Sequence, residues 1–559
     1  MNQLILIIPT IPIVSAILLQ LLSGRLDRRV VWLSMSAVII TFALTLMILG
    51  LELAGLGTHR IGTSHGWGVL LIDPLSAVMS VLIAGISLIV HLYSIRYMAE
   101  EPGYVRFFVL LDLMTAALLI MVAAGDLLTL VIAWHAIGVL LYFLLGHDTR
   151  RQSTFRYAFW TFITYRVGDL ALILAAAVLF HAYGTWSLTE IFARIQSEPH
   201  VETFLGIPAM EAVAVFLALA AFARSAQFLL HNWLPYTMDG PTPVSALMHA
   251  GIVNAGGFLI NRFAPVFVHA SDVLHVLFIV GLITAIVGSV LMLTQNDIKK
   301  SLGYSTMGQM GFMIMECGVG AFSLAIYHLI AHGLFKGTLF LGAGGVIREA
   351  RQDDGIPKDD LYTFVVERRV ALRRPPWLIM AAITLVIPAL VLVLAHWLVS
   401  QEFFQKQGAV VLLFFGWVTG AQLIFATYRM RTERAGRLLT MVLASFTVVV
   451  VGYTLISHAF ELFLYPDPQF RELIHKASNF NVVWFDILIV LTTIVIVIGW
   501  LITYYSEQNG KRASSQPGRL WLGFYAFISR EFYLADLYAW FTRVLIRVAQ
   551  RLNIWLRWA

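Results

Sequence analysis

The feature that most constrains this chain is a succession of apolar runs, each near the roughly 20 residues that a helix needs to cross a bilayer. Hydrophobic residues make up 59% of the 559 residues and charged residues only 13%, which is far more apolar than a soluble protein. The period-two alternation of barrel strands is absent from the runs. The sequence therefore predicts an all-α polytopic membrane protein with about 15 transmembrane helices. The runs fall near residues 3–23, 30–50, 74–95, 105–124, 126–145, 154–180, 207–229, 242–264, 273–294, 304–319, 321–347, 376–399, 408–428, 438–460 and 482–505.

Lysine and arginine are unevenly distributed between the loops that alternate along the chain. Cytoplasmic loops are enriched in these residues, so the bias places the N-terminus outside and the C-terminus in the cytoplasm. The expected location is a bacterial inner membrane. The richer set of loops includes Arg25, Arg28, Arg29, Arg96, Arg106, Arg150, Arg151, Lys299, Lys300, Arg348, Arg351, Lys358, Arg368, Arg369, Arg429, Arg431, Arg434, Lys511 and Arg512. The poorer set holds Arg60, Arg194, Arg262, Lys406, Arg471 and Lys476.

The last stretch, residues 506–559, differs from the runs before it. Arg543, Arg547 and Arg551 recur every four residues and so share one face of a helix. The remaining positions are largely aromatic or aliphatic, a pattern that predicts a basic amphipathic helix on the cytoplasmic surface. Such a helix can also bind a partner protein, and the two roles can coexist.

Ionisable residues inside the apolar runs are the main functional signal, and they are densest at 223–263. Here the sequence predicts an apolar helix that carries Arg224 and ends near His231, followed by a polar loop with three prolines. A second apolar helix then carries His249 and Asn254. A helix that breaks within the membrane is tolerated only where protein or a water-filled cavity covers its backbone. Because ionisable residues are costly at that depth, this stretch indicates part of an ion path.

A second signal is the stripe formed by His328, His332 and Lys336, which stand four residues apart and share one helix face. Histidine exchanges protons near neutral pH, and a lysine in a low-dielectric site can relay one as well. The stripe therefore predicts a proton wire. A metal site is disfavoured because no carboxylate or third ligand lies near the two histidines in sequence.

Three further ionisable residues lie in the fifth and sixth runs. His135 is in the middle of the fifth, and Arg166 and Asp169 are one turn apart in the sixth and can pair. Structural alternatives apply to all three. A lone intramembrane histidine often only links two helices, and the Arg166–Asp169 pair is read as structural because arginine does not deprotonate in proteins.

Cys317 is the one cysteine of the chain, which excludes a disulfide framework and a cysteine-based zinc or iron–sulfur site. We therefore expect no cofactor, metal or catalytic residue in this chain. The net charge of +6 reflects the loops just described rather than nucleic-acid binding. The expectation is a transport subunit, not an enzyme.

Three long motifs carry a family resemblance: HNWLPYTMDGPTPVSALMHA, TQNDIKKSLGYSTMGQMGF and YHLIAHGLFKGTLF. Together with RVGD at 166–169, they resemble the antiporter-like proton-translocating subunits, that is, the NuoL-type subunit of respiratory complex I and the MrpA-type subunit of cation/proton antiporters. The resemblance covers roughly residues 70–350 and implies two inverted five-helix repeats with broken helices. It implies spans one to three in 1–104, a first repeat in 105–268, a second in 269–437 with a cytoplasmic linker at 348–375, C-terminal spans in 438–505 and the tail in 506–559.

The family's functional positions map onto this chain with replacements. Its glutamate in the fifth span is replaced by His135, and its lysine in the seventh by Arg224, so the first half cannot exchange protons by a Glu–Lys pair. A family lysine in the twelfth span is also missing, and His396 lies near that place. By resemblance, the ion path contains His135, Asp169, Arg224, His249, His328, His332 and Lys336, with His249 linking the two halves. Supporting residues are Arg166, His231, Asp297, Lys299 and His396.

These replacements resemble one branch of the family, the DabB-type membrane subunit of two-component inorganic-carbon pumps. The resemblance implies a cytoplasmic, zinc-containing DabA-like partner similar to β-carbonic anhydrases. Ion flux, of protons rather than sodium by family precedent, would then drive the hydration of CO2 to bicarbonate in that partner. Two alternatives stay open: a subunit of complex I, a membrane hydrogenase or an Mrp-type antiporter, and a scaffold that no longer conducts.

Overall fold

The computed structural model describes the N-terminal two thirds of the chain and two later helical segments. The described residues form two compact units, which we treat separately: one of Met1–Gly318, Ala325–Gly344 and Gly523–Ala559, the other of Val319–Leu324 and Gly345–Leu522. Described are residues 2–352 with gaps at 56–58, 62–67, 149, 151, 204–205, 238–239 and 296, then 435–479 and 519–557, and scattered helical positions within 382–394 and 487–498.

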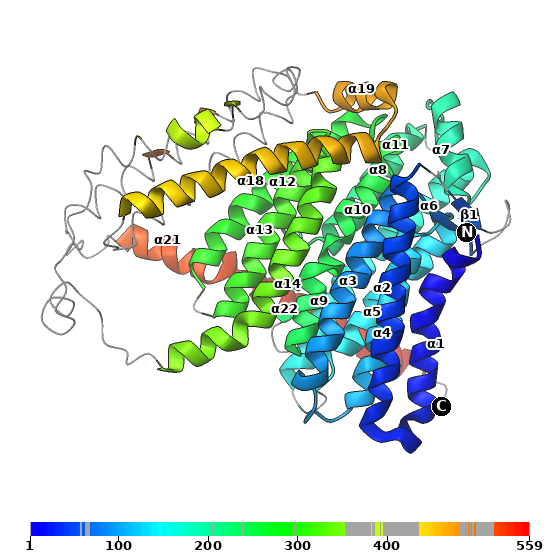
Figure 1. The fold of residues 1–559 in the computed structure, drawn as a ribbon, viewed down its shortest axis with the longest axis vertical. Helices are drawn as coiled ribbons and strands as arrows, with labels where there is room; N and C mark the ends of the chain where they lie inside the picture. Colours follow the sequence, from blue (N-terminus) through cyan, green and yellow to red (C-terminus); the bar gives the residue numbers. More distant parts are fainter. Residues whose placement is uncertain are drawn as a thin grey trace, which may run out of the picture. The chain divides into compact units, whose positions relative to one another are not determined.

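Six long helices open the first unit (Figure 1): α1 (Asn2–Leu26), α2 (Val31–Leu53), α3 (Pro74–Tyr97), α4 (Tyr104–Val122), α5 (Leu127–Leu145) and α6 (Gln152–Tyr183). An antiparallel hairpin of β1 (His59–Ile61) and β2 (Leu70–Ile72) joins α2 to α3. Asp112 of α4 is fully buried and accepts hydrogen bonds from Ser15 Oγ at 2.7 Å and Ser34 Oγ at 2.8 Å. His91 Nε2 lies 3.0 Å from the same carboxylate. The three partners come from α1, α2 and α3, so one satisfied carboxylate ties four helices together.

Nine helices in the described part of the chain are long and apolar enough to span a membrane. Each matches a predicted run. They are Ile5–Arg25, Arg28–Leu53, Pro74–Tyr97, Tyr104–Val122, Leu127–Leu145, Gln152–Tyr183, Thr242–Arg262, Ser271–Leu293 and Phe322–Gly342. The predicted runs at 376–399, 408–428 and 482–505 lie largely outside the described residues, as do most of the linker at 348–375 and His396.

The helix that carries Arg224 is shorter than the sequence predicts. α8 (Ala209–Arg224) ends at Arg224 itself, so the prediction of an end near His231 is wrong, and His231 lies in the loop that follows. The side chain of Gln227 donates to Ser225 O at 2.9 Å and so takes an acceptor that a continuing helix would use. Leu229 then adopts a φ of 72°, a left-handed conformation that a right-handed helix cannot contain.

The following helix is interrupted as well. α9 (Thr242–Ala250) stops one residue after His249, and a short 3-10 turn, η3 (Ile252–Asn254), leads into α10 (Ala255–Arg262). Short helices α7 (Leu188–Ser197) and α11 (Ala264–Phe267) lie at the ends of this segment in the chain. The loop after Arg224 confirms the predicted interruption, whereas the break after His249 was not predicted, because the sequence indicated one helix carrying both His249 and Asn254. A predicted pathway residue lies at or next to each helix end.

α12 (Ser271–Leu293) and α13 (Ile298–Gly318) lie side by side in Figure 1 at close range. A methyl group added at Gly281 would come within 2.5 Å of Met315 N, and one at Gly288 within 2.5 Å of Gly308 N. Close backbone contact of this kind fixes the rotation of α13 about its axis. It leaves Ser305 and Gln309 facing α14 (Phe322–Gln352), whose side chains they contact.

The C-terminal tail contains α21 (Arg519–Ser529), the turn η5 (Glu531–Tyr533) and α22 (Leu534–Trp555), red in Figure 1. α22 confirms the predicted helix, but the tail also reaches into the first unit. Glu531 is only 2% exposed; it accepts a hydrogen bond from Tyr236 OH at 2.7 Å and pairs with Lys300. Glu531 and the next two residues all have φ near 57°, a strained arrangement for residues other than glycine.

The second unit contains α18 (Ala435–Leu464) and α19 (Pro468–Ala477). His475 Nε2 of α19 lies 3.8 Å from Glu461 Oε1 of α18, which links the two helices. Because 353–381 and 395–434 are outside the described residues, the division into two inverted repeats stays a prediction.

Candidate ion pathway

Asp169 of α6 is the centre of a first charged cluster. Its Oδ2 lies 2.8 Å from His135 Nδ1 on α5 and 2.8 Å from Arg166 Nη2, one turn earlier on α6. Its Oδ1 lies 3.9 Å from Arg224 Nη2, at the end of α8. The structure therefore brings together four residues that the sequence placed on three different helices. Gly138 makes this possible, because a methyl group there would lie 2.6 Å from Arg166 Nη2.

Arg224 is held as a fixed cation within this cluster. It is 1% exposed, donates to Trp134 O at 2.6 Å, and lies over the rings of Trp134 and Tyr165 at 4.3 and 4.1 Å. Aromatic faces and one carboxylate thus stabilise its charge away from water. Because arginine keeps its proton, this residue can shape the field around Asp169 but cannot pass a proton on.

His135 is the accessible member of the cluster, with 53% of its side chain exposed. Asp169 beside it is 5% exposed. The ring is therefore accessible from outside the described part of the chain, whereas the carboxylate it contacts is buried.

The stripe on α14 forms a second cluster. His332 and Lys336 are 5% and 2% exposed, and Lys336 Nζ donates to Ser305 Oγ of α13 at 2.8 Å. The rings of His328 and His332 lie 6.3 Å apart. The predicted stripe thus lies along a single helix, with His332 and Lys336 buried and His328 partly buried.

Two residues of this cluster were not predicted from the sequence. Glu316 and Gln309 of α13 both bond the ring of His328, at 3.0 and 2.9 Å. No carboxylate lies close to the two histidines along the sequence. The fold nevertheless brings Glu316 against His328, because α13 and α14 are antiparallel neighbours. The only signal in the sequence was that Ser305, Gln309 and Glu316 repeat at spacings of four and seven on one helix face.

His249 lies beside the stripe, at the end of α9. Its ring stacks on Phe340 of α14, with ring centres 4.2 Å apart, and it is 2% exposed. The backbone of α9 approaches α14 between His332 and Lys336, where Gly333 leaves space for Ala250 O. This position agrees with the expected role of His249 as a link toward the stripe.

The supporting residues have varied positions. His231 is fully buried, stacks on Phe228 and has both ring nitrogens without a hydrogen-bond partner among the described residues. Asp297 accepts from Lys300 N at 2.9 Å and so caps α13, and Lys299 Nζ donates to Thr242 Oγ1 at 3.2 Å. Asp297 thus stabilises the start of α13, whereas His231 is a buried histidine inside the helix bundle.

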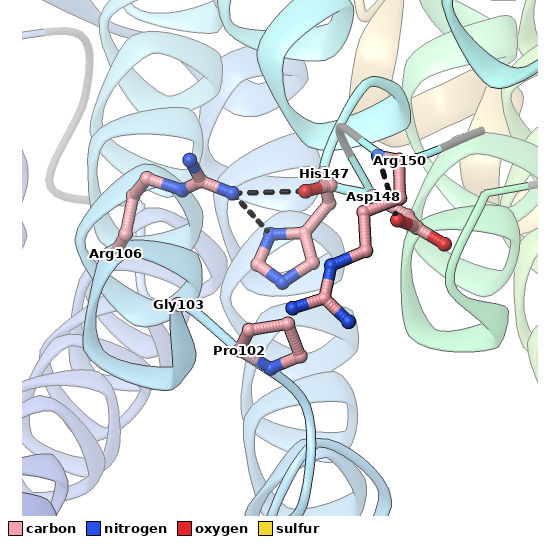
Figure 2. Close-up of a pocket in the computed structure, with 6 residues that line it drawn as sticks. All are labelled: Pro102, Gly103, Arg106, His147, Asp148 and Arg150. Carbon is pink, nitrogen blue, oxygen red and sulfur yellow. Dashed lines mark hydrogen bonds between the residues drawn. The ribbon is translucent and has the colours of Figure 1, made fainter. Parts of the chain in front are cut away.

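A surface pocket of about 210 Å³ lies at the ends of α4 and α5 and is lined by Pro102, Gly103, Arg106, His147, Asp148 and Arg150. Figure 2 shows Arg106 reaching across to His147, where it donates to the backbone oxygen at 2.9 Å. Burial and the charge of Arg106 lower the pKa of His147. None of the predicted pathway residues lines this pocket. Within the described ranges, no group of three His, Cys, Asp or Glu side chains could hold a metal ion.

Residues 124–421 match the model of a family described as NADH:quinone oxidoreductase/Mrp antiporter, transmembrane region. This is more than half of the chain. The chain belongs to this family. Residues 65–108 also match the N-terminal model of complex I chain 5. With its membrane-spanning helices, the chain is an all-α, multi-pass, antiporter-like membrane protein.

Relatives and solved structures agree with this family. The chain is 57% identical, over 99% of both chains, to a protein named probable inorganic carbon transporter subunit DabB1 from Halothiobacillus neapolitanus. It is 37% identical to NADH-quinone oxidoreductase subunit L of Rickettsia felis, over 52% of this chain and 45% of that one. The Mrp complex from Dietzia sp. has a similar fold, with a TM-score of 0.60, 23% identity, and coverage of 98% of this chain and 60% of that one.

Gly333 gives a direct test of the contact between α9 and α14. A methyl group at this position would lie 2.5 Å from Ala250 O, so Gly333→Ala must push the two helices apart. We expect a loss of about 1–3 kcal/mol of stability and slower transport, because His249 moves away from the stripe. Thermal unfolding and ion uptake measure both effects. Gly337→Ala, one turn along, is the matched control: its nearest atom is 3.6 Å away, and it should change neither.

Proposed function

We propose that this chain is the proton-conducting membrane subunit of an inorganic-carbon pump, and that proton flux through it drives CO2 hydration to bicarbonate in a cytoplasmic, zinc-containing, carbonic-anhydrase-like partner. The observation that carries the carbon assignment is the 57% identity, over the full length, to a protein named as an inorganic carbon transporter subunit. Conduction is supported by the line of His328, His332 and Lys336 along α14, of which His332 and Lys336 are buried.

The orientation in the membrane is supported by the charge of the loops. The excess of lysine and arginine in one alternate set supports an N-terminus outside and a C-terminus in the cytoplasm. The similarity to the subunit from Halothiobacillus neapolitanus supports a bacterial inner membrane. In this orientation the tail that begins near residue 506 is on the side where a cytoplasmic partner would bind.

Co-purification tests the proposal against the family alternative. A tagged chain should bring down one large cytoplasmic zinc protein, and bicarbonate uptake should need both. Recovery of several membrane subunits with quinone or flavin would instead identify a redox-linked or Mrp-type complex. A protonophore should stop uptake and a sodium ionophore should not; the reverse result would make sodium the coupling ion.

His135 is expected to titrate during turnover. His135→Gln keeps a hydrogen-bonding side chain beside Asp169 but cannot carry a proton, so uptake should fall by about 100-fold. The amount of assembled complex should not change, because the ring is half exposed. His200→Gln alters an exposed histidine and serves as the control. Full activity of the His135 variant would rule out this role.

A further inference from the structure

We propose that Glu316 and Gln309 make His328 a proton-binding site: the carboxylate is the counter-charge of the protonated ring, and the amide bonds the ring in both of its protonation states. This inference rests on the proposed function and adds to it the place where a proton is held. Both residues lie on α13, outside the histidine stripe.

Both ring nitrogens of His328 have hydrogen-bond partners on α13. Nδ1 lies 3.0 and 3.1 Å from the two carboxylate oxygens of Glu316, and Nε2 lies 2.9 Å from Oε1 of Gln309. The side chains of His328 and Glu316 are 16% and 10% exposed. Neither ring nitrogen depends on solvent for a partner.

The partners of the two nitrogens define the protonation state that this geometry fits. A carboxylate only accepts hydrogen bonds, and so does the amide oxygen that Gln309 turns toward the ring here, so in this arrangement both ring nitrogens of His328 donate. A histidine ring that donates from both nitrogens is the imidazolium cation. The arrangement is therefore that of a proton stored on His328 and neutralised by Glu316, a charge-assisted bond of the stronger kind.

Gln309 allows the proton to leave without loss of a hydrogen bond. A glutamine amide has an acceptor oxygen on one side and a donor NH2 group on the other, and it presents either one by turning over. When Nε2 of His328 loses its proton, this nitrogen becomes an acceptor, and the turned amide can donate to it. Nδ1–H continues to donate to Glu316.

The next proton acceptor is His332, whose ring nitrogens have no hydrogen-bond partner among the described residues. In the transfer, the N–H bond at Nε2 of His328 breaks and a new N–H bond forms on His332, so the positive charge moves with the proton. The charged and titratable groups that act on His332 are His328 and Lys336 on α14 and His249 on α9. Because a protonated Lys336 repels a proton on His332, Lys336 must release its proton first. The site thus imposes an order on the relay.

Magnetic resonance of isotope-labelled histidine in the purified complex tests the site separately from transport. His328→Asn identifies the signal of this ring, which should be that of an imidazolium near neutral pH. Glu316→Gln should convert it to the neutral form and lower uptake by about 100-fold. Gln309→Leu should keep the imidazolium signal, because Glu316 remains the counter-charge, but slow uptake by about tenfold, since Nε2 of His328 loses its partner in both protonation states.

The controls separate this inference from the proposed function. Glu52→Gln changes a buried carboxyl on α2 and should leave the His328 signal and uptake unchanged. If Glu316→Gln does not assemble, Glu316→Asp is the second variant. Its side chain is one methylene shorter, so the carboxylate keeps its charge but lies farther from the ring, and the imidazolium signal should weaken. An unchanged signal in the Glu316 variants, or wild-type uptake, would overturn the inference. If uptake is still lost in Lys336→Met in that case, conduction along the stripe remains supported even though the proton-binding role of Glu316 and Gln309 is rejected.

Discussion

Lys336→Met should abolish ion-driven uptake, with a fall of at least about 100-fold, while the assembled complex remains. Lys336 is 2% exposed and has one hydrogen-bond contact, to Ser305 Oγ. Methionine has nearly the same length and removes the titratable amine, so packing along α14 should be kept. Uptake into proteoliposomes under an imposed proton gradient measures the effect.

Two comparisons make this result specific. Lys476→Met removes an exposed lysine of α19 and should have no effect on uptake. His328→Ala should reduce uptake as Lys336→Met does, because both residues belong to one relay. Full activity of both stripe variants in the assembled complex would refute conduction along α14.

The second large effect is expected on stability. Asp169→Asn removes the carboxylate shared by Arg166, Arg224 and His135 and leaves Arg224 buried without its counter-charge. Loss of one partner from a buried ion pair costs about 3–5 kcal/mol, so little assembled complex should be recovered. Detergent-resistant assembly and thermal unfolding measure this loss. Asp272→Asn, an exposed acid at the start of α12, should be neutral, and equal, mild effects would contradict the assigned role.

Contacts within one helix could be predicted from the sequence. The pairing of Arg166 with Asp169 and the line of His328, His332 and Lys336 follow from helical spacing alone, and both are observed. Apolar length likewise located the nine helices in the described part of the chain that are long and apolar enough to span a membrane, although the predicted runs at 207–229, 304–319 and 438–460 are not among them. In each case the periodicity of the helix decides the result, and no knowledge of neighbouring helices is needed.

Contacts between helices could not be predicted in this way. Glu316 faces His328 only because glycine contacts with α12 set the rotation of α13. The early end of α8 was hidden as well, since the apolar run continues through Phe228 and Leu229. There a local bond from Gln227 to the backbone outweighs hydropathy.

The turn at Glu531 has a consequence for the order in which the protein can be completed. Its partners Tyr236 and Lys300 precede it by more than 200 residues, so both are synthesised long before their shared carboxylate exists. Domains begin to fold from the N-terminus during synthesis, so Lys300 lacks this counter-charge while the helices before the tail are folding. The contact forms only after residue 531 has been synthesised. Maturation of the bundle is thus tied to translation of this turn, and a chain truncated before it lacks the counter-charge of Lys300.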